Sequence, residues 1–265
     1  MAVEFKQKDR YNIDDLISIV ALLRTPEGCA WDRAQTHSSI RKNFIEETYE
    51  VIEAINKENT DGLKEELGDV LLQVALHCQM EKEIGSFDFD DVCNDICQKL
   101  IVRHPHVFGD VTADNEKDAL ASWNDAKLKT KGIKSKSQSM LSVPIELPAL
   151  MRAQKVQSKA SKAGFDWEDG SGALAKVKEE INEFINAADR GDSSDIEEEF
   201  GDLLFSCVNV SRFYNLDSEE ALTKATDKFI RRFSVVEKLA EENGINMNEA
   251  SIEELDSLWN KAKEI

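Results

Sequence analysis

One acidic pattern occurs twice in this chain of 265 residues and constrains its fold more than any other feature. The first copy has a Glu-Glu-x-x-Glu motif at Glu46–Glu50, followed by a Glu-x-x-Asp motif at Glu66–Asp69. The second copy repeats both motifs 133 residues later, at Glu179–Glu183 and Glu199–Asp202. Residues three apart lie on one side of an α-helix, so each motif directs two carboxylates to one face. Two such helices packed side by side would gather four carboxylates in each copy.

Three further motifs recur in the same order, at offsets between 129 and 136 residues. They are a Gly-x-x-Trp motif followed by an acid (Gly28–Asp32 and Gly164–Glu168), a Lys-x-x-x-Arg motif (Lys99–Arg103 and Lys228–Arg232) and a Trp-Asn-x-x-Lys motif (Trp123–Lys127 and Trp259–Lys263). This ordered recurrence indicates the tandem duplication of a unit of about 120 residues. We therefore predict a first helical domain at residues 1–128, a connector rich in Lys, Ser and Pro at 129–148, and a second helical domain at 149–265.

Apolar residues spaced three and four apart predict helices along almost the whole chain, and no stretch shows the alternation typical of strands. The predicted helices are Asp14–Arg24, Ile40–Lys57, Asp61–Glu83, Phe89–His104 and Glu116–Lys129 in the first half, and Leu147–Ala163, Ser171–Arg190, Ser194–Tyr214, Ser218–Asn243 and Ile252–Ala262 in the second. The sequence thus predicts an all-α protein with four or five helices in each repeat. The pattern also predicts a helix at 61–83 that is buried on nearly every side, and a buried stripe of Ile45, Thr48, Ile52 and Ile55 on the helix before it.

The paired acids are candidate metal ligands, because carboxylates converge in this way only if cations neutralise them. They are Glu47, Glu50, Glu66 and Asp69 in the first repeat, and Glu180, Glu183, Glu199 and Asp202 in the second. A set of oxygen ligands favours Mg²⁺, with Mn²⁺ as a substitute. A di-iron bundle would need Glu-x-x-His motifs, which neither half contains. Glu46 and Glu179 are candidates for a general base or for groups that support the ligands.

The formal net charge of −19 argues against a nucleic-acid polymer as the partner, because binding a phosphate backbone requires a basic surface. A small polyanion bridged by metal ions is compatible with it. The repeated Lys-x-x-x-Arg motifs then supply candidates for holding phosphate oxygens: Lys99, Arg103, Lys228 and Arg232. The sequence has no apolar run long enough to span a bilayer, and its five cysteines form no CxxC pair. We expect a cytoplasmic protein without a membrane partner.

Taken together, these motifs resemble the MazG family of nucleoside triphosphate pyrophosphohydrolases over essentially the whole chain. The segments Pro144–Ala153 and Lys162–Trp167 also look like that family's inter-domain junction and the start of its second domain. The resemblance implies an all-α pyrophosphatase fold, a homodimer, and Mg²⁺-dependent conversion of nucleoside triphosphates to monophosphates and pyrophosphate. The implied role is broad house-cleaning of the nucleotide pool. The alternative is a nucleotide-sensing regulator whose domains hydrolyse little.

The tryptophans are candidate substrate contacts. The indole faces of Trp123 and Trp259 would stack on nucleobases of any identity, because every base has a π-face. Packing of a terminal helix is an equally good interpretation of Trp259. The set of candidate substrate-binding residues comprises Trp31, Trp123, Lys127, Trp167, Trp259 and Lys263.

Two expectations concern how the halves work. The second repeat is the expected main catalyst, because Ser206 and Asn209 leave more room beside its acids than Gln73 and His77 leave in the first. The chain also has more large apolar helix residues than one small unit can bury, which predicts a homodimer with its active sites close to the interface. The residues on which this rests are Phe44, Tyr49, Leu72, Leu76, Phe200 and Phe205.

Overall fold

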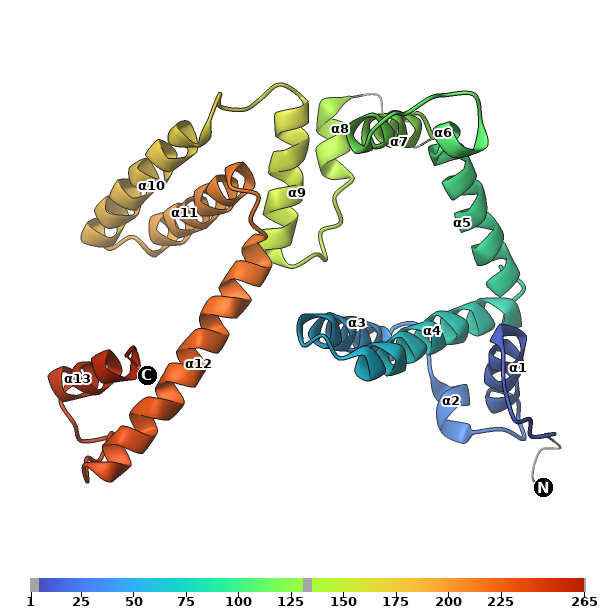
Figure 1. The fold of residues 1–265 in the computed structure, drawn as a ribbon, viewed down its shortest axis with the longest axis horizontal. Coiled ribbons are helices and arrows are strands. Elements are labelled where there is room, and N and C mark those ends of the chain that lie inside the picture. The colour runs from blue at the N-terminus through green and yellow to red at the C-terminus, as the bar shows by residue number, and fades with distance from the viewer. Residues whose placement is uncertain (1–4, 131–134, 265) are drawn as a thin grey trace. The chain divides into compact units, whose positions relative to one another are not determined.

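The computed structural model describes residues 5–130 and 135–264, which form thirteen α-helices and no strand (Figure 1). The all-α prediction is therefore confirmed. The chain divides into two compact units, unit 1 (Met1–Lys131) and unit 2 (Gly132–Ile265). No helix in the described ranges combines the length and the apolarity needed to cross a membrane.

All ten predicted helices are present, and each end lies within two residues of the expected position. Unit 1 contains α1 (Ile13–Leu23), α2 (Ala30–Ala34), α3 (Arg41–Asn56), α4 (Thr60–Glu83), α5 (Phe89–Arg103), α6 (Pro105–Phe108) and α7 (Glu116–Thr130). Unit 2 contains α8 (Lys136–Leu141), α9 (Ala149–Lys162), α10 (Gly170–Arg190), α11 (Ser193–Phe213), α12 (Ser218–Glu242) and α13 (Ile252–Ala262). The helices that the sequence did not predict are α2, α6 and α8, which are too short to show a period. Of these, α8 lies inside the proposed connector and packs against α9, while residues 131–134 are outside the described ranges.

Each unit contains a helix hairpin, α3 with α4 and α10 with α11, whose helices lie side by side (Figure 1). Short turns with strong capping signals produce both hairpins. Glu58 adopts a positive φ of 52°, and the Asn59 side chain then caps α4 by accepting from the backbone N–H of Gly62 at 3.1 Å. Gly191 ends α10 with a φ of 76°, a conformation that glycine adopts without strain, and Asp192 caps α11. Because the connecting turns are short, the paired helices run antiparallel.

The apolar clusters lie to one side of these hairpins. In unit 1, the C-terminal half of α4 packs against α1 and the start of α3, and the buried residues are Val20, Ile40, Ala75, Leu76 and Met80. In unit 2, α12 packs against α13 through Val236, Ala240, Leu258 and Ala262. Leu72 packs on the first cluster as well, so Leu72 and Leu76 stabilise unit 1 from within and are not part of the surface expected to form a dimer.

The predicted burial of the isoleucine stripe on α3 is wrong. Ile45, Ile52 and Ile55 are between 42% and 54% exposed, and Thr48 is exposed as well. The reason is that α3 turns Glu47 and Ala54 inward, which leaves its isoleucine face largely uncovered. The same correction applies to α4, because Leu67 and Leu71 are exposed where the sequence predicted burial on nearly every side.

One arginine in each unit holds the segment that carries the Gly-x-x-Trp motif. In unit 1, the Arg24 guanidinium donates to the backbone oxygen of Asp32 at 2.6 Å and forms a two-pronged ion pair with Glu83 at 2.8 and 2.9 Å. In unit 2, Arg212 of α11 donates to Asp166, with 2.8 Å between Nη1 and Oδ2. This bond lowers the pKa of Asp166 to about 2, mainly because Arg212 stabilises the charged carboxylate.

We predict that Asp166→Asn lowers the free energy of unfolding of unit 2 by about 1–2 kcal/mol at pH 7. The pKa of Asp166 is lowered in the folded chain, so its stabilisation is complete above the ordinary carboxyl range and is lost as the pH falls toward 2. Urea unfolding followed by circular dichroism should therefore show a smaller difference at pH 3 than at pH 7. Asp189→Asn, an exposed change on α10, is the control. A difference that stays constant with pH would contradict the assignment.

Candidate carboxylate centres

The hairpin of unit 1 brings together acids from both of its helices. Carboxylate oxygens of Glu47 on α3 and of Glu66 and Asp69 on α4 all lie within 4.8 Å of one another, and the three residues are half-buried. The spacing of three between Glu66 and Asp69 places both on the face of α4 that meets α3. Ile40, Glu47 and Ala54 follow one line along α3 at intervals of seven residues. Glu47 therefore lies on the packed side of α3, between the apolar residues Ile40 and Ala54.

Charge repulsion in this cluster is visible in its pKa values. Loss of hydration raises the pKa of Glu47, and the nearby carboxylates of Asp69 and Glu50 raise it further. Loss of hydration likewise raises the pKa of Glu66, again with a contribution from Glu50. Glu50 thus lies near Glu47 and Glu66, although the group whose oxygens lie within 4.8 Å of one another consists of Glu47, Glu66 and Asp69. A cation placed among them would relieve both the repulsion and the lost hydration.

Unit 2 contains the matching centre. Oxygens of Glu180 on α10 and of Glu199 and Asp202 on α11 lie within 4.8 Å of one another. Glu180 is only 3% exposed, and its Oε2 atom has no hydrogen-bond partner. A buried carboxylate oxygen without a donor is costly unless a cation approaches it. Glu183 is near as well, because loss of hydration and the Glu180 carboxylate both raise its pKa.

A lysine that sequence analysis did not single out enters the second centre. The Lys176 ammonium contacts Glu180 Oε1 at 2.6 Å and Glu179 Oε1 at 2.7 Å. Lys176 precedes Glu179 by three residues and Glu180 by four, a spacing from which ion pairs on one helix face could have been predicted. Glu179 and its counterpart in unit 1, Glu46, are both exposed, and Glu179 in addition forms an ion pair with Lys176.

The repeated Lys-x-x-x-Arg motifs lie on other helices than the acids, α5 and α12. The acids of α4 belong to its N-terminal half, whereas α5 follows the C-terminal end of α4, and α12 leads away from the α10–α11 hairpin (Figure 1). Within unit 1, Arg103 instead meets α7, where its guanidinium lies 5.8 Å from the ring centre of Trp123. The helices that carry these motifs contact the tryptophan helices, α5 meeting α7 and α12 meeting α13, and among the four cations Arg103 lies against a tryptophan ring.

The two Trp-Asn-x-x-Lys motifs have different surroundings. In unit 1, the Lys127 ammonium lies 4.4 Å from the Trp123 ring centre, so cations from two helices contact this indole. In unit 2, Trp259 packs on Phe229 at 5.0 Å between ring centres and borders the α12–α13 apolar cluster. The Lys263 ammonium there donates to Asn260 at 2.8 Å. Trp259 is accordingly half-buried, in line with a partly structural role.

The tryptophans of the Gly-x-x-Trp motifs are the more accessible ones. Trp31 on α2 is exposed, and Trp167 is exposed although its ring lies against Gly172 at the start of α10. A Cβ atom at position 172 would lie 2.2 Å from the Trp167 ring, so glycine is required there. Neither indole contacts a carboxylate centre through any hydrogen bond recorded in the described ranges.

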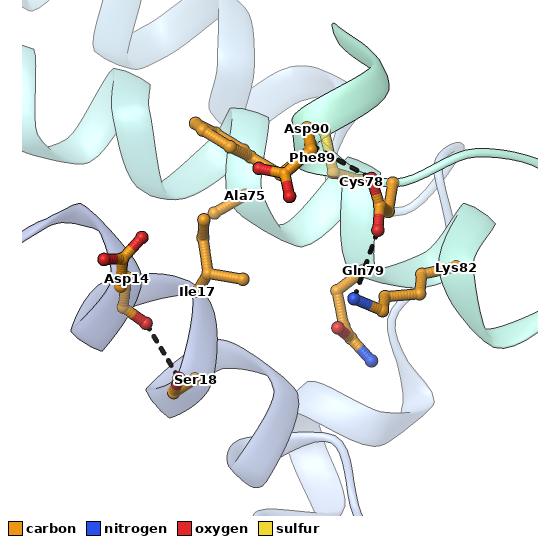
Figure 2. Close-up of a pocket in the computed structure, with 10 residues that line it drawn as sticks. Asp14, Ile17, Ser18, Ala75, Cys78, Gln79, Lys82, Phe89 and Asp90 are labelled. Atoms are coloured by element: carbon orange, nitrogen blue, oxygen red, sulfur yellow. Dashed lines mark hydrogen bonds and ion pairs between the residues drawn. The ribbon is translucent and has the colours of Figure 1, made fainter. Parts of the chain in front are cut away.

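A cavity of about 200 Å³ in unit 1 lies elsewhere, between α1, α4 and the start of α5 (Figure 2). Its lining mixes both charges with a thiol, and includes Asp14, Cys78, Lys82 and Asp90. Lys82 forms an ion pair with Asp88, with 3.3 Å between Nζ and Oδ2. The lining holds three acids and one lysine and is therefore net negative, and its acids are not among the converging groups that could hold a metal ion, so this cavity is a weaker candidate for a polyanion than the carboxylate centres.

Sequence analysis also did not identify a pair of histidines that contact each other in unit 1. His37 and His77 share a hydrogen bond between their Nδ1 atoms, which are 2.6 Å apart, and His37 Nε2 contacts Glu81 Oε1 at 2.7 Å. Burial lowers the pKa of His77, and the neighbouring His37 lowers it further. Forty residues separate the two histidines, so no local spacing could have revealed the pair.

Comparison with known proteins bears directly on these centres. The MazG nucleotide pyrophosphohydrolase domain matches residues 35–108 and again residues 169–237, and each match contains one carboxylate hairpin. This chain belongs to the MazG family. It is 50% identical to the nucleoside triphosphate pyrophosphohydrolase/pyrophosphatase MazG of Thermotoga maritima, over 94% of this chain and 95% of that protein. It is 43% identical to the nucleoside triphosphate pyrophosphohydrolase of Escherichia coli K12, over 95% of this chain and 97% of that protein. A Bacillus subtilis protein, YabN, is 51% identical over 93% of this chain, which covers 50% of YabN.

MazG proteins are metal-dependent hydrolases, and the residues present here suit a metal ion. Each centre offers several carboxylate oxygens within 4.8 Å, and the unit 2 centre has a buried oxygen without a donor. In unit 1, Gln73 follows Asp69 by one turn of α4, and its buried Oε1 atom also has no partner. The donor set in both units consists of oxygens, which is the set that hard divalent cations prefer.

We predict that Glu47→Gln stabilises the metal-free chain, raising the free energy of unfolding by about 0.5–1 kcal/mol. The raised pKa of Glu47 means that its charged form is disfavoured in the folded state, and glutamine removes that charge at equal size. Glu180→Gln should not stabilise, because it leaves Lys176 with one partner fewer. Thermal unfolding in EDTA measures both effects, with Glu46→Gln as the exposed control. Destabilisation by Glu47→Gln would show that the cluster is not strained by repulsion.

Proposed function

We propose that this protein is a Mg²⁺-dependent nucleoside triphosphate pyrophosphohydrolase, converting both ribonucleoside and deoxyribonucleoside triphosphates to the monophosphate and pyrophosphate. The observation that carries the proposal is the pair of carboxylate centres, each on a helix hairpin that lies inside a match to the MazG domain. The relatives in T. maritima and E. coli are named nucleoside triphosphate pyrophosphohydrolases, which supports the same activity for this chain. Mn²⁺ would substitute for Mg²⁺, because it accepts the same oxygen ligands.

The ligands in this proposal are the acids that converge on each hairpin: Glu47, Glu50, Glu66 and Asp69 in unit 1, and Glu180, Glu183, Glu199 and Asp202 in unit 2. When bound, Mg²⁺ would draw in the phosphate oxygens and make a water molecule easier to deprotonate. Glu46 or Glu179 would accept the proton from that water, or would support the ligand beside it in the sequence. Positioning and charge supply most of the catalysis in phosphoryl transfer, so no nucleophilic side chain is required.

The remaining candidates would hold the substrate. Arg103 and Lys127 flank the Trp123 indole, and this cationic, aromatic surface suits a nucleotide whose base stacks while its phosphates are paired. Trp31 and Trp167 are exposed enough to serve in the same way, while Lys99, Lys228, Arg232, Trp259 and Lys263 complete the proposed set. Stacking tolerates any base, so we propose broad specificity and a house-cleaning role. The described cysteines are free, which suits a cytoplasmic location.

The activity is tested by incubating the full chain with ATP, dCTP and dUTP and measuring pyrophosphate and phosphate separately. We expect pyrophosphate from all three substrates, and none after EDTA treatment, because the acids alone repel the triphosphate. Glu183→Gln should reduce kcat at least about a hundredfold, since a displaced metal ion misplaces the substrate. Glu50→Gln, the matched change in unit 1, should reduce it less, because we propose unit 2 as the main catalyst. Release of phosphate, or activity in EDTA, would reject the proposal, and the opposite ranking of the two variants would move catalysis to unit 1.

We also propose a homodimer with its active sites near the interface. The hairpins expose isoleucines on α3 and further apolar residues on α10 and α11, among them Ile181, Ile185 and Phe200. Tyr49 and Phe205 are exposed as well, as expected for part of an interface. A second copy that covers these faces could bring its α5 and α12 cations toward the acids, which they do not reach within the units described here. Exposed apolar surface of this extent favours association.

Sedimentation velocity at micromolar concentration should therefore show a dimer. The double variant Ile52→Glu and Ile185→Glu places a charge on each exposed hairpin face and should give monomers with unchanged helix content, because burying the new charges costs several kcal/mol. Ile84→Glu with Ile252→Glu alters isoleucines that are more exposed and lie outside the hairpin faces, so this control should remain dimeric. A monomeric wild-type chain would contradict the proposal.

A further inference from the structure

The two carboxylate centres have the same acids but a different charge balance. In unit 2, Lys176 lies one helical turn before Glu179 and Glu180 and contacts both, at 2.7 and 2.6 Å. A lysine ammonium is charged at neutral pH, so a positive charge stands beside these two carboxylates. The offset of 133 residues that relates the two acid motifs relates Lys176 to Asn43. The unit 1 centre therefore has an uncharged amide where the unit 2 centre has a cation.

This lysine acts on the most buried acid of the chain's two centres. Glu180 lies between Ala173 and Ala187 on the buried face of α10 and is 3% exposed. Its Oε1 atom has the lysine as a partner, while its Oε2 atom has none. The ammonium thus offsets part of the cost of burying this carboxylate before any metal ion arrives. A divalent ion entering among Glu180, Glu199 and Asp202 approaches the same carboxylate and is repelled by the ammonium beside it.

We infer that Lys176 is a built-in counter-ion that makes the unit 2 centre bind divalent cations more weakly than the unit 1 centre when no nucleotide is present. This inference rests on the metal role of the acids in the proposed function. Lys176 stabilises the metal-free centre, and it leaves Glu180 Oε1 when the ion enters. Asn43 is uncharged and does not compete with a divalent cation for the unit 1 acids, so the unit 1 centre binds the cation more tightly. An ion at unit 2 is then held firmly only when further ligands, such as phosphate oxygens, are added.

A different role for Lys176, holding the acids in position, is also physically reasonable and predicts the opposite effect of its removal on metal binding. A lysine that orients Glu180 and Glu179 would preorganise the ligands, and its removal would weaken metal binding. The geometry favours competition, because the ammonium contacts an oxygen of the buried Glu180 carboxylate, and oxygens of two further acids lie within 4.8 Å of that carboxylate. Two like charges at a common carboxylate repel strongly in surroundings of low polarity.

The experiment measures Mn²⁺ binding to the full chain without nucleotide, using the electron paramagnetic resonance signal of free Mn²⁺. Glu50→Gln with Asp69→Asn removes ligands from unit 1 and reports on unit 2, and Glu183→Gln with Asp202→Asn does the reverse. Adding Lys176→Asn to the unit 2 reporter should lower its Kd about tenfold, since a nearby like charge is removed. Adding Asn43→Lys to the unit 1 reporter should raise its Kd by a similar factor. Lys176→Gln repeats the first change with a better helix former, and circular dichroism checks the fold of every variant.

Lys178→Asn is the matched control, because it removes the same charge from the exposed side of α10. It should change the Kd of the unit 2 reporter less than about twofold, as expected for a charge screened by solvent. Unchanged or weaker Mn²⁺ binding after the changes at Lys176 would overturn the inference while leaving the metal sites intact. Equal effects of Lys176→Asn and Lys178→Asn would overturn it too, since net charge would then be the cause. Absence of Mn²⁺ binding in both reporters would instead reject the metal role in the proposed function.

Discussion

The constraint on which this structure depends is the burial of carboxylates at a helix–helix contact. In unit 2, Ala173, Glu180 and Ala187 follow one another at intervals of seven residues along the face of α10 that meets α11. The alanines allow the two helices to approach closely, and that approach removes water from the glutamate between them. A carboxylate in such a position must be compensated by positive charge, because its hydration is lost. The protein supplies part of this compensation with Lys176 and leaves one oxygen of Glu180 open.

Using the packing face for acids has a consequence for the rest of each hairpin. A helix has one face toward its partner, and on α3 that face is occupied by Glu47 and Ala54, so the isoleucines point elsewhere. Each hairpin therefore has acidic side chains at the contact between its helices and apolar side chains on part of its exposed surface. The compensating apolar packing is found beyond the hairpins, where α4 extends past its acids to reach α1 and where α12 meets α13. The unfavourable free energy of burying these acids is thus offset by apolar contacts elsewhere in each unit.

The two repeats have the same paired acids, but the side chains around those acids differ. The first centre adjoins Gln73, and the second adjoins Lys176 and Ser206, whose hydroxyl donates to the backbone of Leu203. The tryptophan motifs also diverged, since Trp123 is contacted by two cations and Trp259 by an aromatic ring. Two repeats with equal acids can therefore differ in affinity for metal ions and nucleotides, because the neighbouring charges set the electrostatic potential at the ligands. The identity of the acids defines the kind of site, and the side chains around them define how readily it is filled.

Much of this molecule follows from its sequence alone. Periodicity and capping residues determine ten of the helices, because those signals are local, and the repeated motifs determine which acids share a helix face. Local patterns could not decide which face of α3 meets α4: both the isoleucine stripe and the acid stripe have a helical period, and only packing selects between them. Nor could they pair His37 with His77 or place Arg103 on Trp123, since these contacts join segments that are distant in the sequence. The sequence determined which acids share a helix face and the helices that carry them, whereas the tertiary structure decided their burial and their counter-charges, because both depend on which surfaces exclude water.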